Sequence, residues 1–186
     1  LSENLFEGLA PWLQKLPGGL IHVNVVGCAL FAAISGSSAA TVATVGKMSI
    51  PELRKRKYPE KILLGSLAGS GTLGLLIPPS IILIIYGVTV QESIAKLFIA
   101  GIIPGIMIAL IFMGYVIVWS LLNKNKMPTN YENFSFLNKL GKSKQLIPVI
   151  LLILGVIGSI YTGIATATEA ASLGVVGALI LSYFQK

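Results

Sequence analysis

Two short runs of small and hydroxyl residues interrupt the apolar segments of this chain. The first reads Ser-Gly-Ser-Ser at 35–38, and the second reads Gly-Ser-Gly-Thr at 69–72 and precedes the pair Pro78-Pro79. A proline lacks the amide N–H and its ring clashes with the preceding turn, so the second run cannot belong to one plain helix. Broken helices expose amide groups that suit a carboxylate, and carbonyl and hydroxyl oxygens that suit Na⁺. The two runs therefore predict a binding site.

Close helix packing is the alternative explanation of these small residues. Gly65 and Gly69 have the spacing of a small-xxx-small helix contact. That contact does not require the pair Pro78-Pro79, so we favour a site. No acidic residue lies in either run, so backbone carbonyls would supply most of the ligands to a cation.

Two enzyme-like patterns are weaker. Gly69-x-Gly71-x-x-Gly74 matches the dinucleotide-binding fingerprint, but that fingerprint belongs to a βαβ unit and this run lies in an apolar span. His22 and Ser37 would lie about 22 Å apart on one helix, whereas a nucleophile and its base need about 3 Å. Neither pattern predicts catalysis.

Glu169 is the only Asp, Glu, Lys or Arg between Lys144 and Lys186. An ionisable residue inside a membrane is a functional candidate. A carboxylate after the turn predicted at 163–168 could equally stabilise the start of a helix. The sequence supports both interpretations.

The composition indicates an integral membrane protein with several helical spans. Hydrophobic residues make up 54% and charged residues 11% of the 186 residues, against roughly 25% charged in soluble domains. Most of the net charge of +7 comes from two short loops, 51–61 and 123–145. Short basic loops between apolar spans stay cytoplasmic, so we expect contact with the lipid bilayer and not with nucleic acid. The single Cys28 excludes a disulfide framework within the chain.

The apolar pattern predicts an all-α multi-span fold with a re-entrant hairpin and a broken transmembrane helix. The second hairpin arm, 39–50, has 12 residues, or about 18 Å, too short for a core of about 30 Å. The expected segments are an amphipathic connecting helix at 1–17, the re-entrant hairpin at 18–50, a cytoplasmic loop at 51–61, the broken helix at 62–88, a long transmembrane helix at 94–122, a second cytoplasmic loop at 123–145, and a helix pair at 146–186.

The chain resembles the large membrane subunit of TRAP transporters, the DctM-like family. The resemblance covers nearly all of the chain, and Gly-Ser-Gly-Thr followed by Ile-Pro-Pro-Ser is its most specific part. Ala167 departs from the family, which commonly has a proline there. The runs that carry the resemblance are LPGGLIHVNVVGCALFAAISGSSAATVATVG, GSGTLGLLIPPSIILIIYG, LFIAGIIPGI and GIATATEAASLG.

The resemblance implies an architecture and a mechanism. The family subunit has two inverted halves, so this chain corresponds to its middle, and 146–186 starts the second inverted repeat on the scaffold. Such proteins are Na⁺-driven secondary active importers of the bacterial cytoplasmic membrane, not enzymes, and use no organic cofactor. An elevator mechanism moves a transport domain, here 18–50 and 62–88, against the scaffold. The implied partners are a small TRAP membrane subunit and an extracytoplasmic solute-binding receptor.

The resemblance also implies the substrate and the site residues. The GTLGLLIPPS form of the break is most similar to sialic acid transporters, and C4-dicarboxylates are the next organic acids to consider. The alternatives are an ion channel, or a non-transporting scaffold or half-protein that pairs with another chain. The residues expected to frame a sodium site are Ser35, Gly36, Ser38, Gly71, Thr72, Gly74 and Pro78. The residues expected to bind the substrate are Ser37, Ser38, Thr41 and Thr72.

Overall fold

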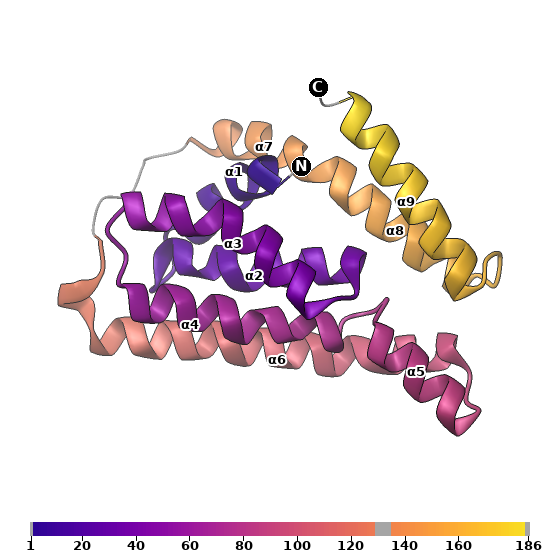
Figure 1. Ribbon diagram of the computed structural model, residues 1–186. Coiled ribbons are helices and arrows are strands. Elements are labelled where there is room, and N and C mark those ends of the chain that lie inside the picture. The colour runs from indigo at the N-terminus through magenta and orange to yellow at the C-terminus, as the bar shows by residue number, and fades with distance from the viewer. Residues whose placement is uncertain (1, 129–134, 185–186) are drawn as a thin grey trace.

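All regular secondary structure in the described residues is helical (Figure 1). The computed structural model describes residues 2–128 and 135–184. The all-α prediction is therefore confirmed for this part of the chain. In chain order the elements are α1 (Ser2–Leu13), η1 (Gly19–Ile21), α2 (His22–Ser35), α3 (Ser38–Lys55), α4 (Glu60–Gly71), η2 (Thr72–Leu75), α5 (Ile81–Val90), α6 (Ile94–Leu122), η3 (Lys124–Lys126), α7 (Phe136–Ser143), η4 (Lys144–Leu146), α8 (Ile147–Tyr161) and α9 (Ala167–Phe184).

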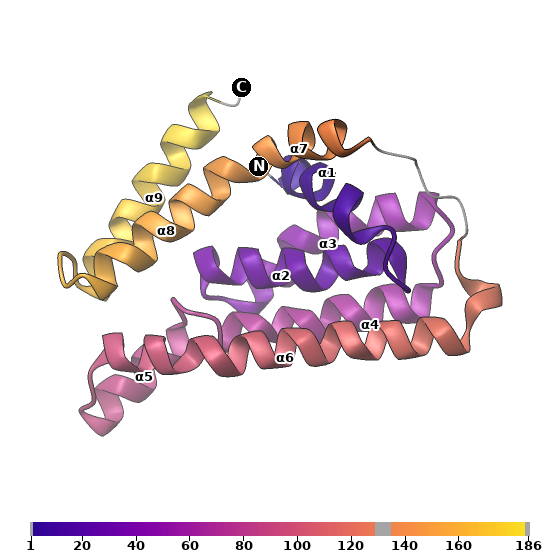
Figure 2. The same ribbon diagram turned by 180° about the vertical axis from the view of Figure 1, so that it is seen from behind.

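Helices α2, α3, α4 and α6 run alongside one another, with α3 antiparallel to α2, α4 antiparallel to α3, and α6 antiparallel to α4 (Figures 1 and 2). α2 and α3 form a helical hairpin, and α4 and α6 pack beneath it. The start of α2, the end of α3, the start of α4 and the end of α6 lie at one end of this bundle, which also carries the basic residues 54–61 and 124–126. The predicted out-and-back course of the chain is therefore present.

The main hydrophobic core lies toward this basic end. α1 has Leu5 and Leu9 one helical turn apart, and both are buried against the hairpin, with Phe6 beside them. α1 is also in contact with α7 and η4, so it lies between the hairpin and the C-terminal helices. The core continues through Val23 and Leu63 to the opposite helices of the bundle.

Large apolar surfaces remain exposed on the long helices. α6 and the stretch Asn138–Tyr161 are long and apolar enough to cross a membrane. On α6, Ile103 is 77% exposed and Leu122 is 79% exposed. Soluble monomers rarely expose contiguous apolar patches of this kind, so these faces are suited to lipid or to another membrane protein.

The hairpin is longer than the sequence predicted. α3 continues through Pro51 to Lys55 and has 18 residues, so it is about 27 Å long. Pro51 is exposed, and water can satisfy the carbonyl that a helical proline leaves free. The predicted loop 51–61 is therefore mostly helix. The argument that the second arm is too short to cross a membrane is wrong.

The C-terminal segments differ less from expectation. The predicted loop 123–145 contains η3 and α7, while its residues 129–134 lie outside the described part. The turn between α8 and α9 ends one residue before Ala167, so Glu169 lies in the first turn of α9. The predicted end of this helix, at residue 186, also lies outside the described residues. The long helix at 94–122 has the predicted bounds.

Candidate functional site

The hairpin turns at Gly36 and Ser37. We call residues 35–38 the hairpin tip. Gly36 ends α2 with φ of +60°, a left-handed conformation that glycine adopts without a steric penalty. Ser37 is extended, and its Oγ accepts a hydrogen bond from the amide of Ala40 at 3.4 Å. Serine is a preferred N-cap, so α3 begins at once and the tip remains short.

The second broken element consists of α4, η2, a non-helical stretch and α5. We call the part from Gly71 to Ser80 the break. The chain leaves α4 at Gly71 and starts α5 at Ile81, with a cis peptide bond between Pro78 and Pro79. Ser80 is buried, and its Oγ donates a hydrogen bond to the Leu75 carbonyl at 2.6 Å. The sequence prediction of a broken helix is confirmed.

The hairpin tip packs directly on the break. A Cβ on Gly74 would lie 2.8 Å from the amide nitrogen of Ser38 and 2.9 Å from the carbonyl carbon of Ser37. A Cβ on Gly36 would overlap the carbonyl oxygen of Pro79. The Ile81 amide also donates to the Gly36 carbonyl at 3.5 Å. Two segments 36 to 45 residues apart in the chain therefore meet through backbone atoms, an approach that the missing side chains of Gly36 and Gly74 allow.

This contact brings four helix ends together. The C-terminal ends of α2 and of α4 with η2 meet the N-terminal ends of α3 and α5. Helix N-termini carry partial positive charge and free amides, and C-termini carry partial negative charge and free carbonyls. The arrangement can therefore hold an anion and a cation close to each other.

Two of the predicted hydroxyl groups lie within hydrogen-bond distance of each other. Ser35 Oγ lies 3.0 Å from Thr41 Oγ1, and Thr41 is fully buried one turn into α3. Ser38 Oγ is also buried and has no hydrogen-bond partner among the described residues. A buried hydroxyl without a partner carries a desolvation penalty, so Ser38 is a candidate ligand for a bound ion or substrate.

The other predicted residues lie along the break. Gly71 is buried against Val42 of α3, and Pro78 is buried against Gly101 of α6. Thr72 is exposed, and its hydroxyl donates to the Gly69 carbonyl at 2.6 Å. The structure therefore places Gly74 against Ser37 and Ser38, whereas the Thr72 hydroxyl is bonded to the Gly69 carbonyl just before it in the chain.

A buried amide holds the hairpin against α4. Asn24 Nδ2 donates to the Leu63 carbonyl at 3.1 Å and to Ser66 Oγ at 3.0 Å. The hydroxyl of Ser70 adds to these hydrogen bonds between α2 and α4. It donates to the Ser66 carbonyl and, at 3.4 Å, to the Asn24 carbonyl. These hydrogen bonds join α2 to α4 across the interior of the bundle.

The sequence pattern did not identify Ser66 or Ser80 as parts of this region. Ser80 has a usable signal, because a serine directly before an apolar helix is a frequent N-cap. Among the described residues, no group of three or more His, Cys, Asp and Glu side chains could hold a metal ion. A cation at the tip would therefore depend on carbonyl and hydroxyl oxygens.

Two other candidates lie away from the tip. His22 is fully buried at the start of α2, with Nε2 2.8 Å from the Pro17 carbonyl, so it is a packed histidine. Glu169 Oε2 accepts hydrogen bonds from both the amide and the hydroxyl of Thr166 at 2.8 Å. This reciprocal cap of α9 supports the helix-start interpretation of Glu169.

The fold and this site are those of a helical membrane protein with discontinuous helices, an arrangement that is typical of transporter binding sites. The family model described as "Tripartite ATP-independent periplasmic transporter, DctM component" matches residues 1–186. The chain therefore belongs to the DctM family, the large permease component of TRAP transporters.

The chain has nearly the same sequence identity to several curated relatives whose names state different substrates. It is 38% identical over 184 residues to the C4-dicarboxylate TRAP transporter large permease protein of Pseudomonas aeruginosa, covering 99% of this chain and 42% of the relative. It is 37% identical to the ectoine/5-hydroxyectoine large permease of Ruegeria pomeroyi, covering 97% and 41%. It is 36% identical to the sialic acid permease of Haemophilus influenzae, covering 99% and 29%. The chain thus spans less than half the length of each of these relatives.

Proposed function

We propose that this protein is the membrane subunit of a receptor-dependent importer in which a sodium gradient drives uptake of an organic acid. The observation that carries the proposal is the meeting of four helix ends at the hairpin tip and the break. Two positive and two negative helix ends at one place suit a carboxylate beside Na⁺. An importer with this site is a secondary active transporter and not an enzyme.

The proposed ligands follow from this geometry. The unpartnered, buried hydroxyl of Ser38 supports its role as a ligand, and the close approach of Gly74 to Ser38 supports the shared site. We propose that the sodium site is framed by Ser35, Gly36, Ser38, Gly71, Thr72, Gly74 and Pro78. We propose that the substrate contacts Ser37, Ser38, Thr41 and Thr72, which requires the Thr72 hydroxyl to leave the Gly69 carbonyl.

The depth of the tip supports a re-entrant hairpin. The break beneath the tip packs on Gly101 and Gly105 of α6. A Cβ on Gly101 would lie 2.9 Å from the Leu76 carbonyl oxygen, and a Cβ on Gly105 would lie 2.9 Å from Ile77 Cγ1. The two glycines are about 10–17 Å from one end of α6 and about 26–32 Å from the other. α5 then extends for ten residues past the break. The hairpin tip is therefore level with the interior of α6 and not with either end of that helix.

An elevator mechanism is the motion that we propose for this arrangement. The transport domain would consist of the hairpin and the broken helix, tied together by Asn24 and by the glycine contacts. α8 and α9 would belong to the scaffold and start a second inverted repeat. These two helices pack mainly against each other and only slightly against the hairpin. They also take part in a small hydrophobic cluster in which Val156 and Ile160 meet Phe98 of α6, with Leu83 and Ile84 of α5 beside it.

The partners and the substrate are also proposals. We place the protein in the bacterial cytoplasmic membrane with a small TRAP membrane subunit and an extracytoplasmic solute-binding receptor. Sialic acid is our first substrate candidate because of the GTLGLLIPPS run, and a C4-dicarboxylate is the second. Identities of 36% and 38% to permeases named for these two substrates do not rank them.

The test is uptake into proteoliposomes that contain the complete permease and its small subunit. Labelled sialic acid and succinate are supplied with or without the receptor, under an inward Na⁺ gradient or an equal K⁺ gradient. Accumulation above equilibrium that requires both Na⁺ and the receptor is the expected result, and the preferred label identifies the substrate. Uptake that does not depend on Na⁺ and never raises the internal substrate concentration above equilibrium would instead indicate a channel.

A further inference from the structure

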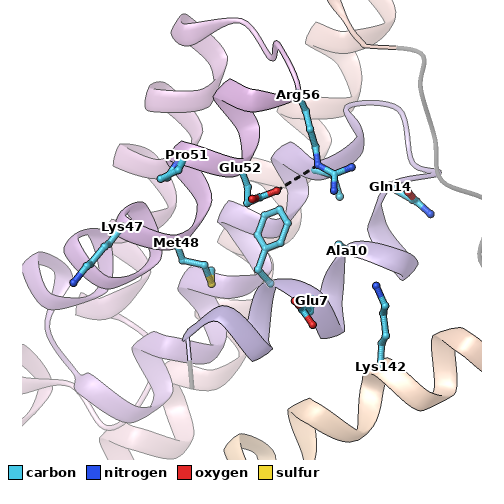
Figure 3. A pocket seen from close by; sticks show the side chains of 11 residues that line it. Glu7, Ala10, Gln14, Lys47, Met48, Pro51, Glu52, Arg56 and Lys142 are labelled. Atoms are coloured by element: carbon cyan, nitrogen blue, oxygen red, sulfur yellow. Dashed lines mark ion pairs between the residues drawn. The ribbon is translucent and has the colours of Figure 1, made fainter.

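A cavity lies toward the opposite end of the hairpin from the tip. It has a volume of about 470 Å³ and lies between α1, α3 and α7 (Figure 3). Its apolar residues Phe6, Leu20 and Met48 are buried. We call this cavity the hairpin-base pocket. Its volume is within the range of small-molecule sites, about 300–1,000 Å³.

The outer part of the hairpin-base pocket is charged. Lys47 of α3, Arg56 at the C-cap of α3 and Lys142 of α7 line it, together with the carboxylates of Glu7 and Glu52. Three cations and two carboxylates leave a net charge of +1. The pocket therefore combines an apolar interior with a positively charged rim, which suits an amphiphilic anion.

Both carboxylates already have partners within the protein. Glu52 Oε2 lies 3.7 Å from Arg56 Nε, and this ion pair crosses the pocket wall (Figure 3). Glu7 Oε2 accepts a hydrogen bond from Gln145 Nε2 at 3.3 Å. Lys47, in contrast, is exposed and makes no hydrogen bond or ion pair with the described residues. A ligand at the rim would meet a cation that the protein itself does not neutralise.

The surfaces beside the pocket are those of a membrane interface. On α1, Trp12 is 44% exposed, and its indole N–H donates to Ser143 Oγ at 2.7 Å. Lys139 Nζ lies 5.5 Å from the centre of the same ring. Leu140 of α7 is also exposed. Tryptophan and lysine beside exposed apolar side chains are typical of helices at the level of lipid headgroups.

We propose that the hairpin-base pocket binds an anionic phospholipid, with its headgroup at the rim that carries Lys47, Arg56 and Lys142 and its glycerol region against Phe6 and Met48. Basic pockets between helices on the cytoplasmic side of membrane proteins bind the headgroups of anionic lipids. The pocket also lies at the basic end of the bundle, where the positive-inside rule places the cytoplasm. A bound lipid would connect α3, at the base of the hairpin, with α1 and α7.

The experiment measures lipid retention by native mass spectrometry of the complete permease in detergent. The probes are phosphatidylglycerol, phosphatidylcholine of the same acyl chains, and inorganic phosphate. The test variant is Lys47→Gln with Lys142→Gln. Its control is Lys124→Gln with Lys126→Gln, which removes the same charge from η3, outside the pocket.

Each lysine near an anionic lipid contributes about a fivefold change in affinity, so the pocket variant should bind phosphatidylglycerol about 25-fold more weakly. The control variant should bind it within about twofold of the wild type. Lys47→Gln alone, at an exposed position without a partner, tests the proposal without disturbing the fold and should weaken binding about fivefold.

Three results would overturn the proposal. The wild type could retain phosphatidylcholine as well as phosphatidylglycerol, or the pocket and control variants could lose affinity equally. Millimolar inorganic phosphate could also displace the lipid, which would make this a site for soluble phosphate and not for a phospholipid.

Discussion

Replacement of Gly74 by alanine isolates the contact between the hairpin tip and the break. Gly74 lies in a helical turn and not at a positive φ, so alanine introduces no backbone strain of its own. The new Cβ would lie 2.8–3.0 Å from three backbone atoms of Ser37 and Ser38, whereas ordinary contacts begin near 3.4 Å. Because no side-chain rotation can relieve backbone contacts, the tip must move by about 0.5 Å or more.

The size of the effect follows from the type of contact. Overpacking of a well-packed site costs about 1–3 kcal/mol, which corresponds to about 5–150-fold in an equilibrium constant. Alanine gains about 0.5–1 kcal/mol over glycine within a helix, but this gain is local and does not restore the contact. We therefore expect Gly74→Ala to insert and fold, and to reduce Na⁺-dependent uptake by about one to two orders of magnitude.

The assay compares this variant with Gly65→Ala in proteoliposomes of the complete permease. A Cβ on Gly65, in α4, would have no other atom within 4 Å. Gly65→Ala should therefore transport like the wild type and be slightly more stable to heat. Wild-type uptake by Gly74→Ala, at equal amounts of inserted protein, would show that the tip and the break do not form the transport site.

Three further predictions concern the same region. Replacement of Pro78 and Pro79 together by alanine should abolish uptake but not membrane insertion, because a continuous helix removes the exposed helix ends; retained uptake would refute the role of the break. Ser38→Ala should raise the Na⁺ concentration for half-maximal uptake, and an unchanged value would remove this hydroxyl from the sodium site. Asn24→Leu removes the hydrogen bonds from α2 to the Leu63 carbonyl and to Ser66 Oγ and should lower stability by about 1–3 kcal/mol, measured by thermal unfolding in detergent; an unchanged melting temperature would show that this amide does not hold the hairpin.

Much of the helical pattern could be predicted from local sequence. The long helix at 94–122 is apolar throughout, and its predicted bounds are confirmed. The break at Pro78-Pro79 is also predictable, because the missing amide and the ring clash are local effects. The end of α3 is not, since an exposed proline does not always end a helix and Pro51 is accommodated where water can replace the lost bond.

The site could be predicted only in part. The positions of the tip and the break are marked by short runs of glycine, serine and proline. Their contact is a long-range event, and nothing local indicates that Gly36 would face Pro79 or that Gly74 would face Ser38. Ser80 differs from these glycines, because its bond to the Leu75 carbonyl joins residues only five positions apart. The role of each residue in binding Na⁺ or substrate stays a prediction.

The sequence by itself determined the membrane character, the helical spans, the two interruptions and the basic end of the bundle. These features follow from hydropathy, from proline and glycine geometry and from charge placement, each of which acts over one or two turns of the chain. The tertiary structure alone decided which helix ends meet, how Asn24 ties the hairpin to α4, and where α1 and α7 enclose a pocket. Those outcomes depend on the packing of segments tens of residues apart, where a single Cβ decides whether two backbones can touch.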